Sequence, residues 1–114
     1  MSAQVAADLR AAADVLERDG WTQSDYYDDK SGFRCVYGAL HFVASGGRRS
    51  EPQLNDDGGD DGPRVGPAAA QLASLLRLTA PSVDLVDWND APRRRAAEVI
   101  AALRAAADRA EADQ

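Results

Sequence analysis

The chain has 114 residues, the size of one small domain, and folding can bury roughly two thirds of its surface without disulfides. Its 13 basic and 19 acidic residues give a net charge of −6, which argues against generic binding to nucleic-acid backbones. We also expect a cytoplasmic protein with no membrane partner, because no apolar stretch reaches roughly 18 residues and no signal-like segment opens the chain. One cysteine excludes an internal disulfide and cannot build a zinc site alone.

Residues 2–18 are predicted to form an amphipathic helix. Its apolar positions recur at steps of three and four residues: Val5, Leu9, Ala12 and Leu16. Gly20 is expected to end this helix as a left-handed cap, and Trp21 can fold back on the apolar face. The polar run 22–34 contains turn residues and predicts a small hairpin or a short extended element.

Residues 33–45 form an almost uncharged run. Its length and small residues favour a buried central helix, although its β-branched and aromatic residues would also suit a strand. Gly38 costs about 1 kcal/mol relative to alanine inside a helix, so we expect another backbone to approach closely at that position.

The segment 46–67 has nine glycines and prolines among its 22 residues and is predicted to be a mobile acidic loop. Its carboxylates are candidate calcium ligands by chemistry: Asp56, Asp57, Asp60 and Asp61. No acidic residue closes the loop at the twelfth position that an EF-hand requires. We therefore expect no metal site and no cofactor.

Two further helices complete the predicted fold. The first runs from Pro67 to Thr79, and Pro81 prevents its continuation. The last helix has Asn89 or Asp90 as its cap, Pro92 in its first turn, and these apolar positions: Ala96, Val99, Ile100, Leu103, Ala107 and Ala110. The chain is thus predicted to be one mainly α domain, residues 1–114, with about four helices around one core.

Cys35 and His41 are candidate catalytic residues, because a thiol beside an imidazole can be an activated nucleophile. Six residues of helix separate the two side chains by about 120°, so a direct pair is disfavoured and a packed thiol is the simpler interpretation. The alternative is a nucleophile at a helix N-terminus, served by His41 or Asp90. Tyr37 lies one turn before His41, which predicts a stacked or hydrogen-bonded pair at the edge of the core.

Trp88, Asn89 and Asp90 combine a large aromatic ring with two polar groups where a helix begins. Together with Tyr37, Trp88 and Asn89 are candidate ligand-binding residues. The simpler interpretation is that Trp88 fills the core while a neighbouring polar side chain caps the helix.

Arg93, Arg94 and Arg95 place three cations in the predicted first turn of the last helix, where they oppose the helix dipole. Asp84, Asp87 and Asp90 can neutralise them locally. Otherwise the triplet is a candidate site for an anionic small ligand such as phosphate.

Four short motifs follow one another along the chain: Ala6 to Ala13 in the first helix, Gly20-Trp21-Thr22-Gln23, Cys35-x-x-Gly38-Ala39-Leu40, and Trp88-Asn89-Asp90-Ala91-Pro92. In this order they resemble a family of small uncharacterised proteins of actinobacteria and some of their phages, annotated only as a domain of unknown function. The resemblance spans nearly the whole chain and implies an actinobacterial or phage context. It implies no catalytic role for any of these residues.

Three functional hypotheses fit these observations. The first is a noncatalytic helical module that binds a protein partner or a second copy of itself through alanine-rich helix faces. The alternative is a small enzyme or ligand-binding protein with a pocket around Cys35 and residues 88–90. The third is an acidic inhibitor of phage type that mimics nucleic acid, suggested by the fifteen aspartates.

The excess negative charge lies in one part of the chain. Residues 1–63 contain 12 acidic and 6 basic residues, whereas the remainder contains seven of each. A local anion site in the C-terminal half therefore stays compatible with an acidic protein.

Overall fold

The computed structural model of the chain describes residues 2–44, 46 and 62–112. These residues form five helices and no β-strand: α1 (Ser2–Asp19), α2 (Val36–Ala44), α3 (Gly62–Leu75), α4 (Pro81–Asn89) and α5 (Ala96–Ala112). The mainly helical fold is as predicted, but the predicted number of helices is one too few. Among the described residues, no helix is long and apolar enough to cross a membrane.

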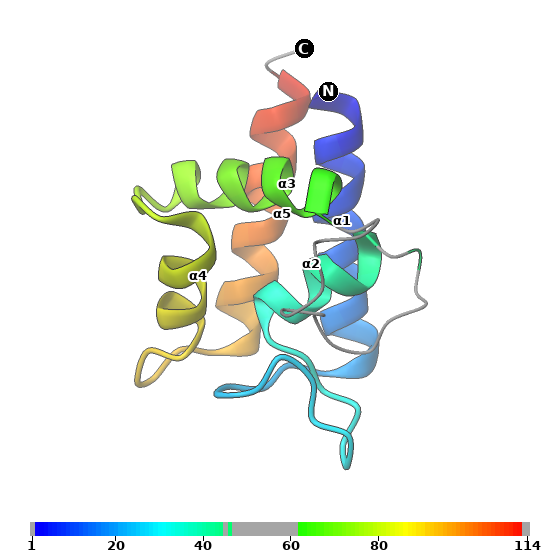
Figure 1. Ribbon diagram of the computed structural model, residues 1–114, viewed down its shortest axis with the longest axis vertical. Helices are drawn as coiled ribbons and strands as arrows, with labels where there is room; N and C mark the ends of the chain where they lie inside the picture. Colours follow the sequence, from blue (N-terminus) through cyan, green and yellow to red (C-terminus); the bar gives the residue numbers. More distant parts are fainter. Residues whose placement is uncertain (1, 45, 47–61, 113–114) are drawn as a thin grey trace.

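Helices α1 and α5 lie side by side and antiparallel along the long axis, while α3 crosses them and α4 descends beside them (Figure 1). Their shared core contains large residues such as Leu9, Leu16 and Leu103, and several alanines that are almost fully buried. Because alanine is small, the two helices can pack closely along their length. Exposed ion pairs join the two helices, with Arg10 of α1 bound to Asp108 at 2.8 Å and Arg104 of α5 bound to Asp14 and Glu17.

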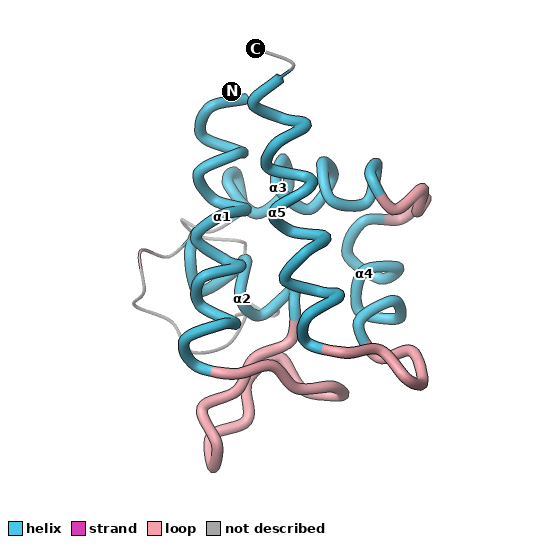
Figure 2. The backbone as a smooth tube through the Cα atoms, turned by 180° about the vertical axis from the view of Figure 1, so that it is seen from behind, coloured by secondary structure: helices cyan, strands magenta, loops and turns pink. Residues whose placement is uncertain are grey.

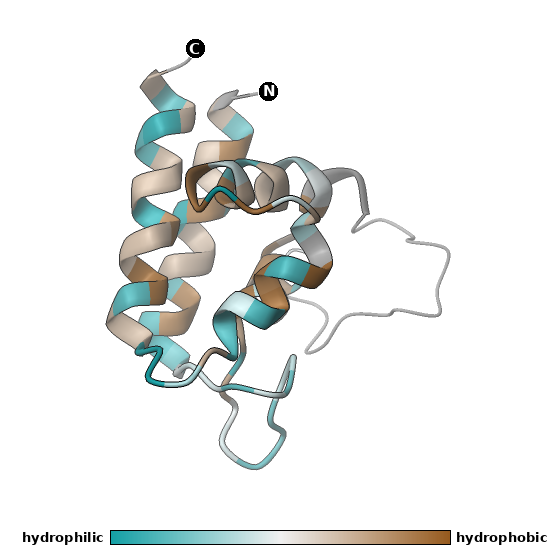
Figure 3. Cartoon of the chain, turned by 90° about the vertical axis from the view of Figure 1, so that its left-hand side faces the viewer, coloured by the Kyte–Doolittle hydropathy of each residue, from teal (hydrophilic) through white to brown (hydrophobic). Residues whose placement is uncertain are grey.

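Gly20 ends α1 in the predicted way. Its φ is +108°, and its N–H donates to the carbonyl of Leu16 at 2.9 Å. Trp21 then packs against the hydrophobic core, as predicted. The segment between α1 and α2 forms the loops at the lower edge of Figure 2 and is mostly hydrophilic (Figure 3). The expected extended element is present only as isolated bridges, which pair Arg34 with Trp21 and with Tyr27.

The predicted bounds of α2 and α3 are partly wrong. Helix α2 begins at Val36, so Cys35 precedes the helix and does not lie inside it. Helix α3 begins at Gly62, which places Pro67 within the helix and shortens the predicted loop. The buried side chain of Val65 anchors this additional turn. Of the remaining predicted loop, residues 47–61 lie outside the described part of the chain.

Helix α3 ends four residues before its predicted end. Arg77 adopts a left-handed conformation with φ +60°, and the N–H of Leu78 donates to the carbonyl of Ala73 at 2.8 Å. This hydrogen bond closes the helix in a Schellman-like turn.

Helix α4 was not predicted, because Pro81 was interpreted only as the end of the preceding helix. Pro81 in fact occupies the first position of α4, where its missing N–H is tolerated. The Asp84 carboxylate accepts hydrogen bonds from the N–H groups of Thr79 and Ala80, at 3.1 and 2.9 Å. These bonds fix the turn that enters the helix.

Candidate functional site

Asn89, the last residue of α4, is fully buried and connects three parts of the fold. Its Oδ1 accepts hydrogen bonds from the indole N–H of Trp21 at 2.6 Å and from the backbone N–H of Val36 at 3.0 Å. Its Nδ2 donates to the carbonyl of Thr22 at 3.1 Å and to Asp90 Oδ1 at 3.0 Å. One side chain therefore uses both ends of its amide to hold α4, the segment after α1 and the start of α2 together.

Asn89 caps α2, not the last helix. The N–H of Val36 is one of the donors that a helix N-terminus leaves without a partner in the helix itself, and Asn89 satisfies it. The Cys35 sulfur accepts a second such N–H, from Gly38 at 3.3 Å. The prediction that Asn89 or Asp90 caps the last helix is wrong, because Glu98 accepts the N–H of Arg95 at 2.8 Å and caps α5.

Further hydrogen bonds attach residues 23 and 24 to the end of α4. Gln23 Nε2 donates to the carbonyls of Asn89 and Ala91, at 3.1 and 2.9 Å. The backbone N–H of Ser24 donates to Asp90 Oδ1 at 2.8 Å, although Ser24 has a φ of +72°. A left-handed conformation at a non-glycine residue costs roughly 1 kcal/mol, so these hydrogen bonds hold the loop in a strained shape.

Gly38 lies where another backbone approaches α2, as predicted. A Cβ at this position would overlap the carbonyl oxygen of Tyr26. The same oxygen accepts the N–H of Cys35 at 3.3 Å. The motif containing Cys35 and Gly38 therefore seats the loop against the N-terminal turn of α2.

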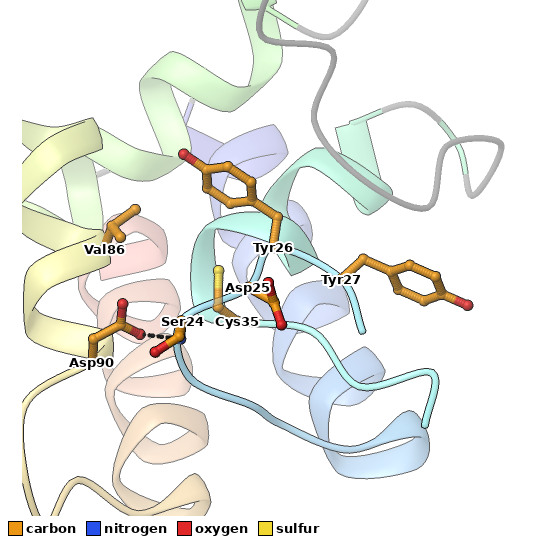
Figure 4. A pocket seen from close by; sticks show the side chains of 7 residues that line it. All are labelled: Ser24, Asp25, Tyr26, Tyr27, Cys35, Val86 and Asp90. Atoms are coloured by element: carbon orange, nitrogen blue, oxygen red, sulfur yellow. Dashed lines mark hydrogen bonds between the residues drawn. The ribbon is translucent and has the colours of Figure 1, made fainter. Parts of the chain in front are cut away.

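A pocket of about 310 Å³ opens between this loop, the start of α2 and the end of α4. Its lining residues are Ser24, Asp25, Tyr26, Tyr27, Cys35, Val86 and Asp90 (Figure 4). They supply two carboxylates, two tyrosines and one thiol, and none of them is basic. The volume is at the lower end for ligand pockets and suits one side chain or a small molecule.

Cys35 is only 2 % exposed, and its sulfur borders this pocket. Burial raises the pKa of the thiol; the N–H of Gly38 partly offsets the rise, and the negative charge of Asp90 adds to it. A cysteine with a raised pKa stays protonated at neutral pH and is a poor nucleophile. The structure places Cys35 at the N-terminus of α2 and brings it to the same pocket as Asp90, as the alternative hypothesis requires. The surroundings of Cys35 nevertheless raise the pKa of its thiol and do not activate it.

Tyr37 and His41 form the ring contact that the sequence predicts. Their ring centroids lie 4.8 Å apart in an edge-to-face arrangement, and Tyr37 also contacts Tyr26 at 6.2 Å. Burial raises the pKa of Tyr37. Neither Tyr37 nor His41 lines the pocket, whereas Tyr26, which contacts Tyr37, does.

Trp88 and Arg94 form a second aromatic contact. The guanidinium of Arg94 lies 4.2 Å from the ring centroid of Trp88, and its Nε–H donates to the Trp88 carbonyl at 3.0 Å. Trp88 packs against the core and does not line the pocket. Arg94 also lies 3.7 Å from Glu98.

The arginine triplet precedes α5 and does not occupy its first turn. Arg93 and Arg95 are exposed, and Arg93 has a φ of +69°. Glu98 pairs with Arg94 and sits at the helix N-terminus, where an anionic ligand would bind. Of the three arginines, Arg94 is therefore paired with a carboxylate of α5, and the described residues show no ion pair within 4.0 Å between the triplet and Asp84, Asp87 or Asp90.

Sequence reasoning missed Arg34, whose charged side chain is 8 % exposed. Its guanidinium lies over the rings of Tyr27 and Phe42, at 4.8 and 4.0 Å, and Nη1 donates to Asp19 at 3.2 Å. The sequence does contain a signal that could have indicated a buried charge, because Arg34 is the only charged residue in the run 33–45. The pocket-lining residues 24–27 were also missed, because they belong to the polar run interpreted as a hairpin.

Among the described residues, no group of three or more His, Cys, Asp or Glu side chains is arranged to hold a metal ion. The candidate calcium ligands Asp56, Asp57, Asp60 and Asp61 lie outside those residues.

The fold and site define a small, mainly helical protein in which the segment after α1, the start of α2 and the end of α4 meet beside a polar pocket. The chain belongs to a family of unknown function (DUF6197), whose family model matches residues 1–109. No curated protein and no solved structure matches the chain.

Proposed function

We propose that the chain is a noncatalytic binding module that takes a positively charged group, an ammonium or a guanidinium, in the pocket beside Cys35. The observation that carries the proposal is the composition of the pocket wall, which has two carboxylates, two tyrosine rings and no basic residue. Such a wall attracts a cation by charge and can contact it through aromatic rings.

The individual groups of the pocket support this assignment. Asp25 is exposed and borders the pocket. Asp90 accepts hydrogen bonds from Ser24 and Asn89 through Oδ1, so within the described part of the chain its Oδ2 is available to a ligand. The ring of Tyr27 already contacts the guanidinium of Arg34, so we assign the aromatic contact with a ligand cation to the ring of Tyr26.

The same geometry disfavours the enzyme hypothesis. A nucleophilic thiol needs a lowered pKa or a nearby base, whereas burial and Asp90 raise the pKa of Cys35. His41, the candidate base, contacts Tyr37 outside the pocket. Binding without catalysis therefore fits the pocket better than acyl or group transfer.

The nucleic-acid mimic also receives little support from the described residues. Carboxylates on α1 and α5 are bound to arginines, as in the pairs of Arg104 with Glu17 and of Arg10 with Glu111. A mimic must present unpaired negative charges as a continuous surface. Alternating charges of both signs do not form such a surface.

The proposal can be tested by following backbone amide NMR signals during titration with acetyl-arginine amide and acetyl-lysine amide. We expect the signals of residues 24–27 and 90 to shift, with acetyl-glutamate amide as the anionic control that leaves them unchanged. Asp25→Asn should weaken binding roughly fivefold, the effect of losing about 1 kcal/mol of charge interaction. Asp29→Asn, an exposed carboxylate of the same loop outside the pocket, is the matched control and should bind normally.

A second arm distinguishes a partner protein from a small molecule. A short peptide with one central arginine should bind at least tenfold more tightly than acetyl-arginine amide if the cation belongs to a protein partner. Equal affinities would indicate a small cationic ligand. Equal binding of the anionic control, or equal loss in both aspartate variants, would contradict the proposed function.

A further inference from the structure

The pocket beside Cys35 continues onto one face of α4. Val86 and Asp90 project from this helix and its end into the pocket (Figure 4). The N–H of Asp90 donates to the carbonyl of Val86 at 3.0 Å, so Asp90 still follows the helical path. Val83 lies three residues before Val86 and seven before Asp90, and residues at these spacings share one face of a helix. The face that lines the pocket therefore carries Val83 about one turn further along.

Val83 is the more exposed of two large hydrophobic side chains at the surface of the described residues. It is 62 % exposed, whereas Leu85 on the opposite side of α4 is fully buried. The other exposed side chain, Phe33, covers Gly20, because a Cβ on that glycine would overlap the ring. Phe33 thus has a packing role within the chain, while Val83 faces solvent next to the pocket.

The charges around Val83 restrict what can cover it. Asp87 is exposed four residues further along α4, and Asp25 and Asp90 line the pocket. Neither α4 nor the pocket wall contains a basic residue. The same face of a second copy, an anionic lipid surface or a nucleic acid would bring negative charge against these carboxylates. Charge complementarity therefore favours an occupant that is cationic and also carries an apolar group.

The spacing along α4 fits an extended peptide. A helix rises about 1.5 Å per residue, so Val83 lies roughly 7–8 Å along α4 from the middle of the stretch between Val86 and Asp90. In an extended chain, residues two positions apart point to the same side and lie roughly 6.6 Å apart. One peptide can therefore place a cationic side chain in the pocket and an apolar side chain, two residues away, on Val83.

We propose that the partner is an extended peptide segment with an arginine or lysine in the pocket and an apolar side chain two residues away against Val83. This inference rests on the proposed function, because the pocket must accept the cation. Asp25 and Asp90 attract the charge, and the apolar side chain removes the exposed surface of Val83 from water. A small cationic ligand would reach the pocket alone.

Two peptides test the proposal by NMR titration: acetyl-Leu-Gly-Arg-Gly-Leu amide and acetyl-Ser-Gly-Arg-Gly-Ser amide. Leucine stands on both sides of the arginine, so one leucine reaches Val83 in either chain direction. The leucine peptide should bind about fivefold more tightly, the effect of covering roughly 40 Å² of apolar surface. Both peptides should shift the amide signals of residues 24–27 and 90, whereas only the leucine peptide should shift that of Val83.

Val83→Ser should remove the difference in affinity between the two peptides, because it removes the apolar contact that distinguishes them. Ala101→Ser, at an exposed position of α5 outside the pocket, is the matched control and should keep the fivefold difference. Circular dichroism shows whether both variants remain helical, which we expect because each substitution lies on an exposed helix surface.

The outcomes separate this inference from the proposed function. If neither peptide shifts the signals of residues 24–27 and 90, the pocket takes no cation and both proposals are wrong. If the two peptides bind the natural chain equally tightly, or if the difference survives Val83→Ser, the pocket takes a cation but no apolar side chain lies on Val83. Either of these results overturns the inference about the peptide and leaves the proposed function standing.

Discussion

Asn89 makes more connections between separate segments than its place at the end of a short helix suggests. Its amide satisfies the indole of Trp21, the N–H of Val36 and the carbonyl of Thr22 in a buried site. A buried polar group that loses its partner costs about 1–3 kcal/mol, so these contacts depend on one another. Removing the amide affects the loop and the start of α2 together.

Asn89→Ala should therefore lower the free energy of unfolding by about 3 kcal/mol, since it leaves two donors and one acceptor without partners. Gln23→Ala, which removes hydrogen bonds from the half-buried edge of the same site, should cost only about 1 kcal/mol. Urea unfolding followed by circular dichroism measures both. Equal losses in the two variants would mean that Asn89 does not hold these segments together.

Cys35 is expected to make stability fall at alkaline pH. Burial raises the pKa of its thiol above the ordinary value near 8.5. Below that value the thiol is protonated in both states, and its contribution to stability is fully present. As the pH rises past it, the unfolded chain loses the proton first, so the free energy of unfolding falls by up to about 1.4 kcal/mol per pH unit until the pKa of the folded state is passed.

Urea unfolding at pH 7, 8, 9 and 10 under reducing conditions measures this dependence. Cys35→Ser retains a capping atom but has no group that titrates in this range, so its stability should fall less steeply. Tyrosine titration is common to both proteins and cancels in the comparison. Parallel curves for the two proteins would show that the thiol has no raised pKa.

At the scale of elements, two glycines in helices should respond differently to the same substitution. Gly38→Ala places a Cβ against the Tyr26 carbonyl, so we expect a loss of about 2–4 kcal/mol despite the better helix propensity. Gly66→Ala in α3 meets no atom within 4 Å apart from its chain neighbours, but the ring of Pro67 crowds the new Cβ and offsets the gain in helix propensity, so we expect the free energy of unfolding to change by less than about 1 kcal/mol. Urea unfolding measures both variants, and equal changes would contradict the close contact between α2 and the loop at Gly38.

Periodicity predicted α1 and most of α5, because each helix buries one regular apolar face. It missed α4, whose apolar positions are few and whose first residue, Pro81, equally signals the end of a preceding helix. It also assigned Asn89 to the nearest following helix. A capping residue separated by 53 positions from its helix leaves no local pattern, so only the fold reveals that Asn89 belongs to α2.

For the whole molecule, the mainly helical fold could be predicted, whereas the pocket could not. Its lining comes from residues 24–27, from Cys35 and from the end of α4, which are brought together by hydrogen bonds across as many as 68 residues. Sequence reasoning identified Cys35 and Asp90 as candidates but grouped them with His41 and Trp88. Those two side chains instead contact Tyr37 and Arg94.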